Sequence, residues 1–148
     1  MKKFLDLLAI DHKIDFSVSL EPVSHNGHPE FWVRVNEQMI LEGTLTHGVK
    51  AQCAIGLLDP MVIEIGMKHK KYSEEKETAV IIQSINIDGF EIVPHWTHLA
   101  VYQNDHDHGS PTSYLGFNGT WRLAIPEPFY RWRHRVTGQG WLLVPSTT

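Results

Sequence analysis

The sequence has very little cysteine: Cys53 is the only one in 148 residues. One cysteine excludes an intrachain disulfide, and with it the disulfide framework that small secreted domains use for stability. Cys53 lies in the apolar run AQCAIGLL, where its expected role is that of a small buried hydrophobic side chain. A chain of this length buries roughly two-thirds of its unfolded surface, so one core suffices and we expect a single domain over residues 1–148.

Long apolar runs are also absent. No stretch approaches the ~20 apolar residues of a transmembrane helix, so we expect no membrane-spanning segment. The opening MKKFLDLLAI starts like a signal peptide, but Asp6 interrupts its apolar run and no small-residue cleavage site follows. The sequence therefore predicts a protein without a signal peptide that stays in the cytoplasm of the cell that makes it.

Basic charge is not in excess. Lys and Arg number 13 and Asp and Glu 17, which gives a net charge of −4 with neutral histidines. Without an extended basic field the attraction for phosphate groups is weak, so nucleic acid is not an expected partner. The sequence also lacks a nucleophile elbow, a Gly-rich phosphate loop and an assignable pair of glycosidase carboxylates, so no catalytic residue is predicted.

Apolar and polar residues alternate with a period of two along much of the chain, whereas helical periodicity is scarce. The segments expected to form strands are 15–20, 31–36, 38–43, 51–58, 61–67, 79–87, 90–93, 119–125, 129–136 and 140–144. Asp88-Gly89 favours a type I′ hairpin turn, because both residues accept positive φ. Short strands at this spacing predict an all-β fold, a two-sheet antiparallel β-sandwich that is jelly-roll-like, preceded by an N-terminal arm or helical turn over residues 1–12.

Three segments are expected to be loops. Pro22 and the following SHNGHP should end the first strand, because turn-forming residues dominate there. Residues 68–77, KHKKYSEEKE, carry both signs of charge and are interpreted as a solvated hairpin tip. Residues 104–113, NDHDHGSPTS, form a long polar loop, and loops of that length tend to be functional or mobile.

The loop over 104–113 contains the candidate metal ligands Asp105, His106, Asp107 and His108. In an extended segment the two histidines project to one side and the two aspartates to the other. Two imidazoles suit zinc, copper or iron, and two carboxylates suit calcium, which we expect as the cofactor ahead of a transition metal. The alternative is a solvated polar turn that binds no metal.

A metal-dependent enzyme is the alternative function. Cupin metal sites also use two histidines separated by one residue on a jelly roll, followed by a carboxylate and a later histidine. Here no Glu follows closely, so His106 and His108 would need a third ligand from elsewhere in the chain. The candidates for it are His95, His98 and His134.

The block PFYRWRHR, residues 128–135, combines aromatic and basic side chains. In a strand, Arg131 and Arg133 share one face and Trp132 lies on the other. Such a block can stack on sugar rings beside cations, or it can fill the core with its rings while the arginines coat the surface. The candidate ligand-binding residues on the first interpretation are Trp96, Tyr102, Arg131, Trp132 and Arg133.

Two resemblances involve these segments. Tyr114-Leu115-Gly116, Asn118 to Leu123, Gly140-Trp141-Leu142 and the Ile87-Asp88-Gly89 hairpin resemble uncharacterised small proteins of tailed bacteriophages, especially those of marine cyanobacteria. That resemblance brings no catalytic residues. It implies a homo-oligomeric protein that assembles in the host cytoplasm with a phage structural protein and is carried in the virion.

The second resemblance covers Phe16 to Gly89. Its order of a strand, the FWVRVN hairpin, the VIEIGMKH strand and a long strand into IDG is similar to that of calcium-dependent xylan-binding modules. Those modules are compact jelly rolls that hold calcium in loops at one end, and only Asp105 and Asp107 offer comparable loop carboxylates here. We therefore expect a non-enzymatic β-sandwich that binds a surface glycan with calcium, or that serves as a virion-associated module.

Overall fold

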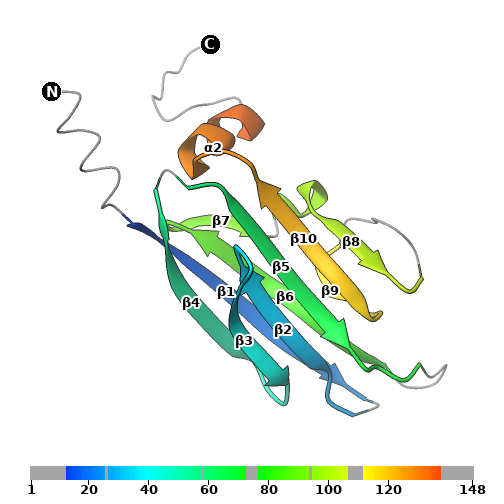
Figure 1. Cartoon of the computed structure of the whole chain (residues 1–148). Helices are drawn as coiled ribbons and strands as arrows, with labels where there is room; N and C mark the ends of the chain where they lie inside the picture. The colour runs from blue at the N-terminus through cyan, green and yellow to red at the C-terminus, as the bar shows by residue number, and fades with distance from the viewer. Residues whose placement is uncertain are drawn as a thin grey trace, which may run out of the picture.

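The computed structural model describes residues 13–25, 27–57, 59–72, 77–93, 95–106 and 112–137. Two antiparallel five-stranded sheets face each other (Figure 1). The first has the order β4 (Val49–Gly56), β1 (Lys13–Ser24), β6 (Thr78–Ile87) and β7 (Phe90–Val93), with β9 (Tyr114–Leu115) also paired to β6. The second has the order β3 (Gln38–Thr44), β2 (Glu30–Val35), β5 (Met61–Lys68), β10 (Gly119–Ile125) and β8 (Val101–Asn104). The predicted all-β sandwich is confirmed, while the expected arm 1–12 and the strand 140–144 lie outside the described residues.

The core lies between the two sheets and follows the alternation in the sequence. Phe16, Val18 and Leu20 of β1 are each at most 1% exposed, and they belong to the same buried core as Ile63 and Ile65 of β5. Burial of these apolar faces is the main driving force that stacks one sheet on the other. Trp121 on β10 is the largest of the completely buried side chains, and its indole N–H donates to the Thr112 carbonyl at 2.8 Å.

Tight turns join the consecutive strands as predicted. Asp88 and Gly89 have φ of 50° and 83°, and Asn36 and Glu37 have φ of 51° and 67°. Two successive positive values are the mark of the type I′ turn, whose twist matches that of the flanking strands. Asn36 also accepts a hydrogen bond from Val62 N–H at 2.8 Å, which fixes the β2–β3 hairpin to β5.

The prediction that Pro22 ends the first strand is wrong. β1 continues to Ser24, and Pro22 stands opposite Val80 of β6. β4 pairs with β1 only as far as Leu20, so beyond that point β1 has a sheet neighbour on one side alone. At an edge position the missing N–H of proline costs no ladder hydrogen bond.

The predicted strand 129–136 is instead the helix α2 (Phe129–Thr137). Phe129 and Trp132 are 1% and 3% exposed, and this i, i+3 spacing places both rings on the face of the helix that packs on the core. Pro128, just before the helix, accepts a hydrogen bond from Trp132 N–H at 3.0 Å. Neither α2 nor the short 3-10 turn Thr97–Leu99 is long and apolar enough to span a membrane, within the part of the chain that the structure describes.

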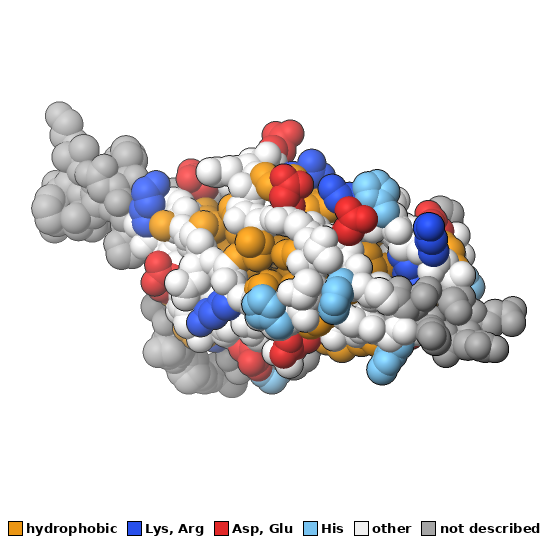
Figure 2. Space-filling model, turned by 90° about the horizontal axis from the view of Figure 1, so that it is seen from below, with side chains coloured by type: hydrophobic (Ala, Val, Ile, Leu, Met, Phe, Trp, Pro, Cys, Tyr) orange, Lys and Arg blue, Asp and Glu red, His pale blue; other side chains and the backbone are white. Residues whose placement is uncertain are grey.

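β3 and β4 are edge strands of the two sheets, and they lie along the side that Figure 2 views. Hydrophobic side chains are visible between the charged groups on this side (Figure 2). The half-buried apolar side chains of the two strands are Ile40, Leu41, Val49, Ala51 and Cys53. Partial burial raises the pKa of the Cys53 thiol, so this side chain acts as the small hydrophobic group expected from the sequence.

The outer face of the second sheet carries Trp32, which pairs with Gly66 across β2 and β5. A Cβ at Gly66 would lie 2.2 Å from both Cε2 and Cζ2 of the indole, so the Trp32 ring occupies the space that a side chain would need. The Arg34 guanidinium carbon lies 4.4 Å from the centre of the same ring. The Trp32 ring therefore lies between the backbone of Gly66 and the guanidinium group of Arg34.

Gly66→Ala is expected to lower the free energy of unfolding by about 1–3 kcal/mol, because the added methyl group displaces the indole. Urea denaturation measures the loss. In a Trp32→Ala background the same substitution should cost far less, since the ring is gone. An equal cost in both backgrounds would show that the Trp32 contact is not the cause.

Candidate functional site

Polar and aromatic side chains gather at the end of the sandwich where β5 and β8 finish and β10 begins, at the lower right of Figure 1. The segments are joined by backbone as well as side chains: Asp105 N–H donates to the Asn118 carbonyl at 3.1 Å. We call this set the loop-end site. Its residues are Lys70, Tyr72, Glu77, Asp105, His106, Tyr114, Phe117 and Asn118.

Tyr72 is the more exposed of the two tyrosines of the loop-end site, at 50% exposure. Its hydroxyl donates to Asp105 Oδ2 at 2.9 Å and accepts the backbone N–H of Asn118 at 2.9 Å. Its ring centre lies 5.8 Å from that of Phe117, at an interplanar angle of 48°. Partial burial and the Asp105 carboxylate raise the pKa of Tyr72 against the opposing effect of Asn118 N–H, so the hydroxyl remains a donor. The ring is therefore fixed in place while half of it faces solvent.

Beneath Tyr72 lies Lys70, whose side chain is only 4% exposed. Its ammonium donates to the Glu77 carboxylate and to the Gly116 carbonyl, the latter at 2.6 Å. The same nitrogen is 5.3 Å from the centre of the Tyr72 ring, a distance at which a cation is attracted to the ring face. The expectation of a solvated tip over residues 68–77 is therefore wrong at Lys70, while 73–76 lie outside the described residues.

Glu77 connects Lys70 to the second exposed ring, Tyr114. Its carboxylate also accepts Thr78 N–H at 2.9 Å and the Tyr114 hydroxyl. Partial burial alone would raise the pKa of Glu77, but the hydrogen bonds of Lys70 and Thr78 outweigh it and the pKa is lowered. Tyr114 is 41% exposed and its ring crosses Gly116, where a Cβ would be 3.0 Å from Cε1.

His106 and Asp105 are the two predicted metal ligands that the structure describes. The His106 imidazole stacks on Phe117 with ring centres 4.6 Å apart and an angle of 13°, and Asp105 accepts the Tyr72 hydroxyl. Within the described residues no three His, Cys, Asp or Glu side chains gather as a metal site would require. Asp107 and His108 lie outside the described residues, so the four-residue metal site stays a prediction.

The histidines named as third ligands are engaged elsewhere or distant. His95 Nε2 lies 3.0 Å from Glu91 Oε1, and the His98 ring is 6.1 Å from that of Trp96. His134 is on α2, which follows the far end of β10 from the loop-end site (Figure 1). Seven residues of β10 separate these two ends of the sandwich, a span of about 20 Å.

The structure places two of the five predicted ligand-binding residues in the core. Tyr102 is 2% exposed, with its hydroxyl bonded to the Phe117 backbone, and Trp132 is 3% exposed. Neither ring has a free face for a sugar, because core side chains already cover it. Arg131 is exposed on α2, the Arg133 guanidinium lies 3.9 Å from the Phe90 ring centre, and Trp96 is half-buried beside His98. Arg131, Trp132 and Arg133 of α2 are thus not brought together with Asp105 and His106, whereas the buried Tyr102 is bonded to Phe117 of the loop-end site.

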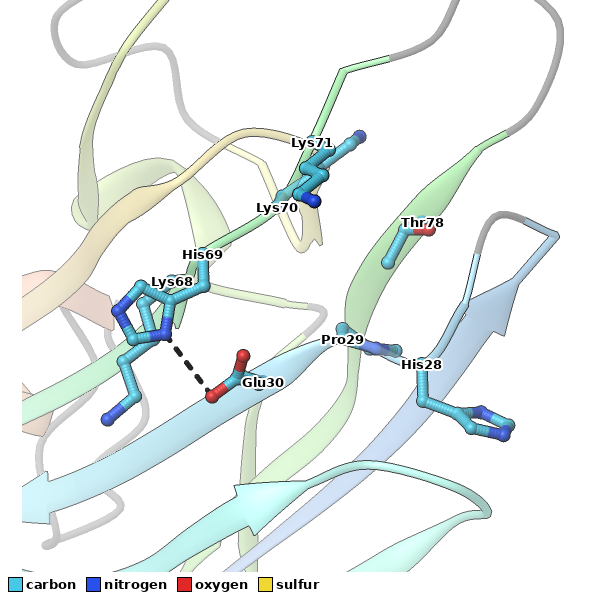
Figure 3. Close-up of a pocket in the computed structure, with 8 residues that line it drawn as sticks. All are labelled: His28, Pro29, Glu30, Lys68, His69, Lys70, Lys71 and Thr78. Carbon is cyan, nitrogen blue, oxygen red and sulfur yellow. Dashed lines mark hydrogen bonds and ion pairs between the residues drawn. The ribbon is translucent and has the colours of Figure 1, made fainter.

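A pocket of about 160 Å³ adjoins the loop-end site and shares Lys70 with it. Figure 3 shows that its lining comes from three segments: the approach to β2, the end of β5 and the start of β6. The lining residues are His28, Pro29, Glu30, Lys68, His69, Lys70, Lys71 and Thr78. His69 Nδ1 lies 3.2 Å from Glu30 Oε1, so the one carboxylate of the lining is already partnered.

Sequence reasoning missed Tyr72, Tyr114 and Phe117, the rings that form the exposed surface. A single aromatic residue inside the charged run KHKKYSEEKE was a usable indication for Tyr72, because such a residue gains little from a solvated turn. Lys70 carried no comparable indication. Its burial depends on Gly116, which is distant in the sequence.

The comparisons with known proteins identify proteins of similar fold. No family model and no curated protein matches the sequence. Among solved structures, vCBM60 in complex with galactobiose matches with a TM-score of 0.51 and 15% identity, over 76% of this chain and 97% of that chain. A selenomethionine form of vCBM60 matches with a TM-score of 0.52 and 14% identity, over 75% of this chain and 90% of that chain. That structure is presented as an evolutionary link, by circular permutation, between two families of calcium-dependent carbohydrate-binding modules. The expected jelly-roll-like sandwich, and the looser of the two resemblances, are supported by these neighbours.

Proposed function

We propose that this protein is a non-enzymatic carbohydrate-binding module and that the loop-end site holds the sugar. The observation that carries the proposal is Tyr72, a half-exposed ring locked by two hydrogen bonds on its hydroxyl. Sugar rings present C–H groups that pack on aromatic faces, and a ring that is already immobile loses little entropy on binding. The fold shared with vCBM60, solved with galactobiose, supports the same class of ligand.

Groups able to recognise sugar hydroxyls surround the Tyr72 and Tyr114 rings. Asp105 and Glu77 carry acceptor oxygens at the surface, and the exposed His106 imidazole supplies a donor or an acceptor. A few polar groups beside apolar rings are the usual composition of a saccharide or small-molecule site. The site is open rather than enclosed, which suits an internal segment of a polysaccharide.

We propose Asp105 as a ligand for calcium. Its carboxylate stands at the rim of the loop-end site, and carboxylate oxygens are the ligands that calcium prefers. Asp107, two residues on, would share the ion. When bound, calcium would supply a positive centre for sugar hydroxyl oxygens at the same rim, with transition metals less favoured by these oxygen donors.

The biological setting follows from the sequence resemblance to tailed-phage proteins. We propose that the glycan belongs to a cell surface and that a phage structural protein carries the module, as an oligomer, in the virion. Co-purification of the protein with virions tests this setting separately from the glycan itself.

Tyr72→Ala is expected to weaken glycan binding about five- to thirtyfold, because loss of one stacked aromatic side chain at a binding surface costs on the order of 1–2 kcal/mol. Tyr72→Phe keeps the ring and loses only its hydroxyl bonds, so a smaller loss is expected. Calorimetry with an oligosaccharide identified on a glycan array measures both. Met39→Ala, at a 42% exposed side chain on β3, is the matched control and should bind normally.

Two outcomes would contradict the proposed function. The first is a glycan array on which the folded protein binds nothing, with or without calcium. The second is full binding by both Tyr72→Ala and Tyr114→Ala, which would move the site away from the loop end.

A further inference from the structure

We infer that the glycan is acidic, and that the pocket beside the loop-end site binds the carboxylate or sulfate group of one of its sugars. This inference rests on the proposed function and specifies its ligand. Three lysines and two histidines line the pocket against a single carboxylate, Glu30. The whole chain carries a net charge of −4, so this local excess of positive groups opposes the average of the molecule.

The one carboxylate of the lining is the group best able to repel an anion, and it has a local partner. Glu30 lies 3.2 Å from His69 Nδ1 across the pocket wall (Figure 3). Lys68 extends toward Glu42 at 3.9 Å, a loose contact between two substantially exposed side chains. A pair of this kind is worth little in water, so Lys68 can exchange Glu42 for an incoming anion.

Lys70 joins the pocket to the aromatic surface. It lines the pocket, and its ammonium also lies 5.3 Å and 5.9 Å from the ring centres of Tyr72 and Phe117. Its contacts with Glu77 and Gly116 hold it in place at the boundary of the two surfaces, and because Glu77 balances its charge, the attraction for an anion comes from the other lysines of the lining. A saccharide stacked on Tyr72 thus has an anion-attracting hollow beside it, and an acidic substituent of that sugar or the next occupies the hollow.

The size of the pocket agrees with a substituent rather than a whole sugar ring. A volume of about 160 Å³ is well below the roughly 300 Å³ at which ligand pockets for whole small molecules begin. Thr78 and the two imidazoles, from His28 and His69, add polar groups at its wall. Carboxylate and sulfate share the chemistry that such a wall recognises: negative oxygens that accept hydrogen bonds.

The test compares three matched oligosaccharides by calorimetry: a neutral galactan fragment, a polygalacturonate fragment and a sulfated galactan fragment. At least one acidic fragment should bind about tenfold or more tightly than the neutral one, and that preference should shrink as salt rises from about 50 to 300 mM. The two acidic arms separate a carboxylate from a sulfate as the bound group.

The variant Lys68→Gln/Lys71→Gln should abolish the preference while binding of the neutral fragment persists. Lys13→Gln/Lys50→Gln removes the same charge from exposed positions on β1 and β4 and should keep the preference. Equal or tighter binding of the neutral fragment overturns the inference but leaves the proposed function intact, as does a preference that survives Lys68→Gln/Lys71→Gln. Absence of binding to all three fragments, and to a general glycan array, overturns both.

Discussion

Replacing Trp132 by alanine is expected to lower the free energy of unfolding by about 3–5 kcal/mol, the usual cost of removing a large aromatic side chain from a core. Trp132 is 3% exposed and its ring centre lies 6.1 Å from that of Phe129, so the deletion leaves a cavity under α2. Urea denaturation at two or more protein concentrations measures the loss and detects any effect of self-association.

This substitution also decides between the two interpretations that the aromatic-basic block allows. Arg131→Ala, one residue away on the exposed face of α2, should change stability by no more than about 0.5 kcal/mol. Glycan binding by the folded fraction of Trp132→Ala should equal that of the unmodified protein. Trp132→Phe is the variant to use where alanine prevents folding, and a binding loss in folded Trp132→Phe would restore the residue as part of a sugar site.

Glu77→Ala is the second large effect, with an expected loss of about 1–3 kcal/mol, because it removes the charged partner of the buried Lys70 ammonium, while water at the 43% exposed Glu77 side chain compensates in part. The charge left behind is the Lys70 ammonium, 4% exposed, and among the described residues only the Gly116 carbonyl would still accept a hydrogen bond from it. Adding Lys70→Met to Glu77→Ala should recover most of that loss, since an apolar chain of similar length then fills the space. Equal instability of the single and double variants would show that the buried charge is not the cause.

The ion pair of Lys70 and Glu77 should make the protein less stable as the pH falls. The pKa of Glu77 is lowered in the folded protein, so its ionised form is stabilised by folding. The contribution is complete at pH values above the unfolded-state pKa, and it is lost as pH falls through the lower folded-state pKa. Denaturation curves of the unmodified protein and of Lys70→Met/Glu77→Ala should therefore converge toward acid pH.

The fold was largely predictable because alternation at period two is a local property of the chain. In β1, Phe16 to Leu20 alternate with serines, and the Asp88-Gly89 dipeptide determines its turn without help from distant residues. The strand prediction failed at Phe129 and Trp132, where a spacing of three residues also fits a helix. Three-dimensional packing, not local pattern, decided between the two.

The candidate site was predicted only at Asp105 and His106. Its other members become neighbours through pairing between segments distant in sequence, such as the contact of Lys70 with Asn118, at 2.8 Å from N–H to Oδ1. Likewise Tyr102 is buried where β8 pairs with β10, whereas Tyr72 lies beyond the end of β5 and is exposed. Local sequence does not predict which distant segments pair. A tyrosine that will be buried and one that will be exposed therefore cannot be distinguished from the sequence alone.

The described chain enters and leaves at one end of the sandwich. Lys13 begins β1 opposite Gly56, and α2 follows Ile125, which pairs with Met61 at that same end (Figure 1). An affinity tag, a fluorescent reporter or a carrier protein joined directly to Lys13 or to Thr137 would therefore start on the side away from Tyr72. Immobilised through either fusion, the module presents its sugar-facing rings to the solution, which makes surface-based binding assays practicable.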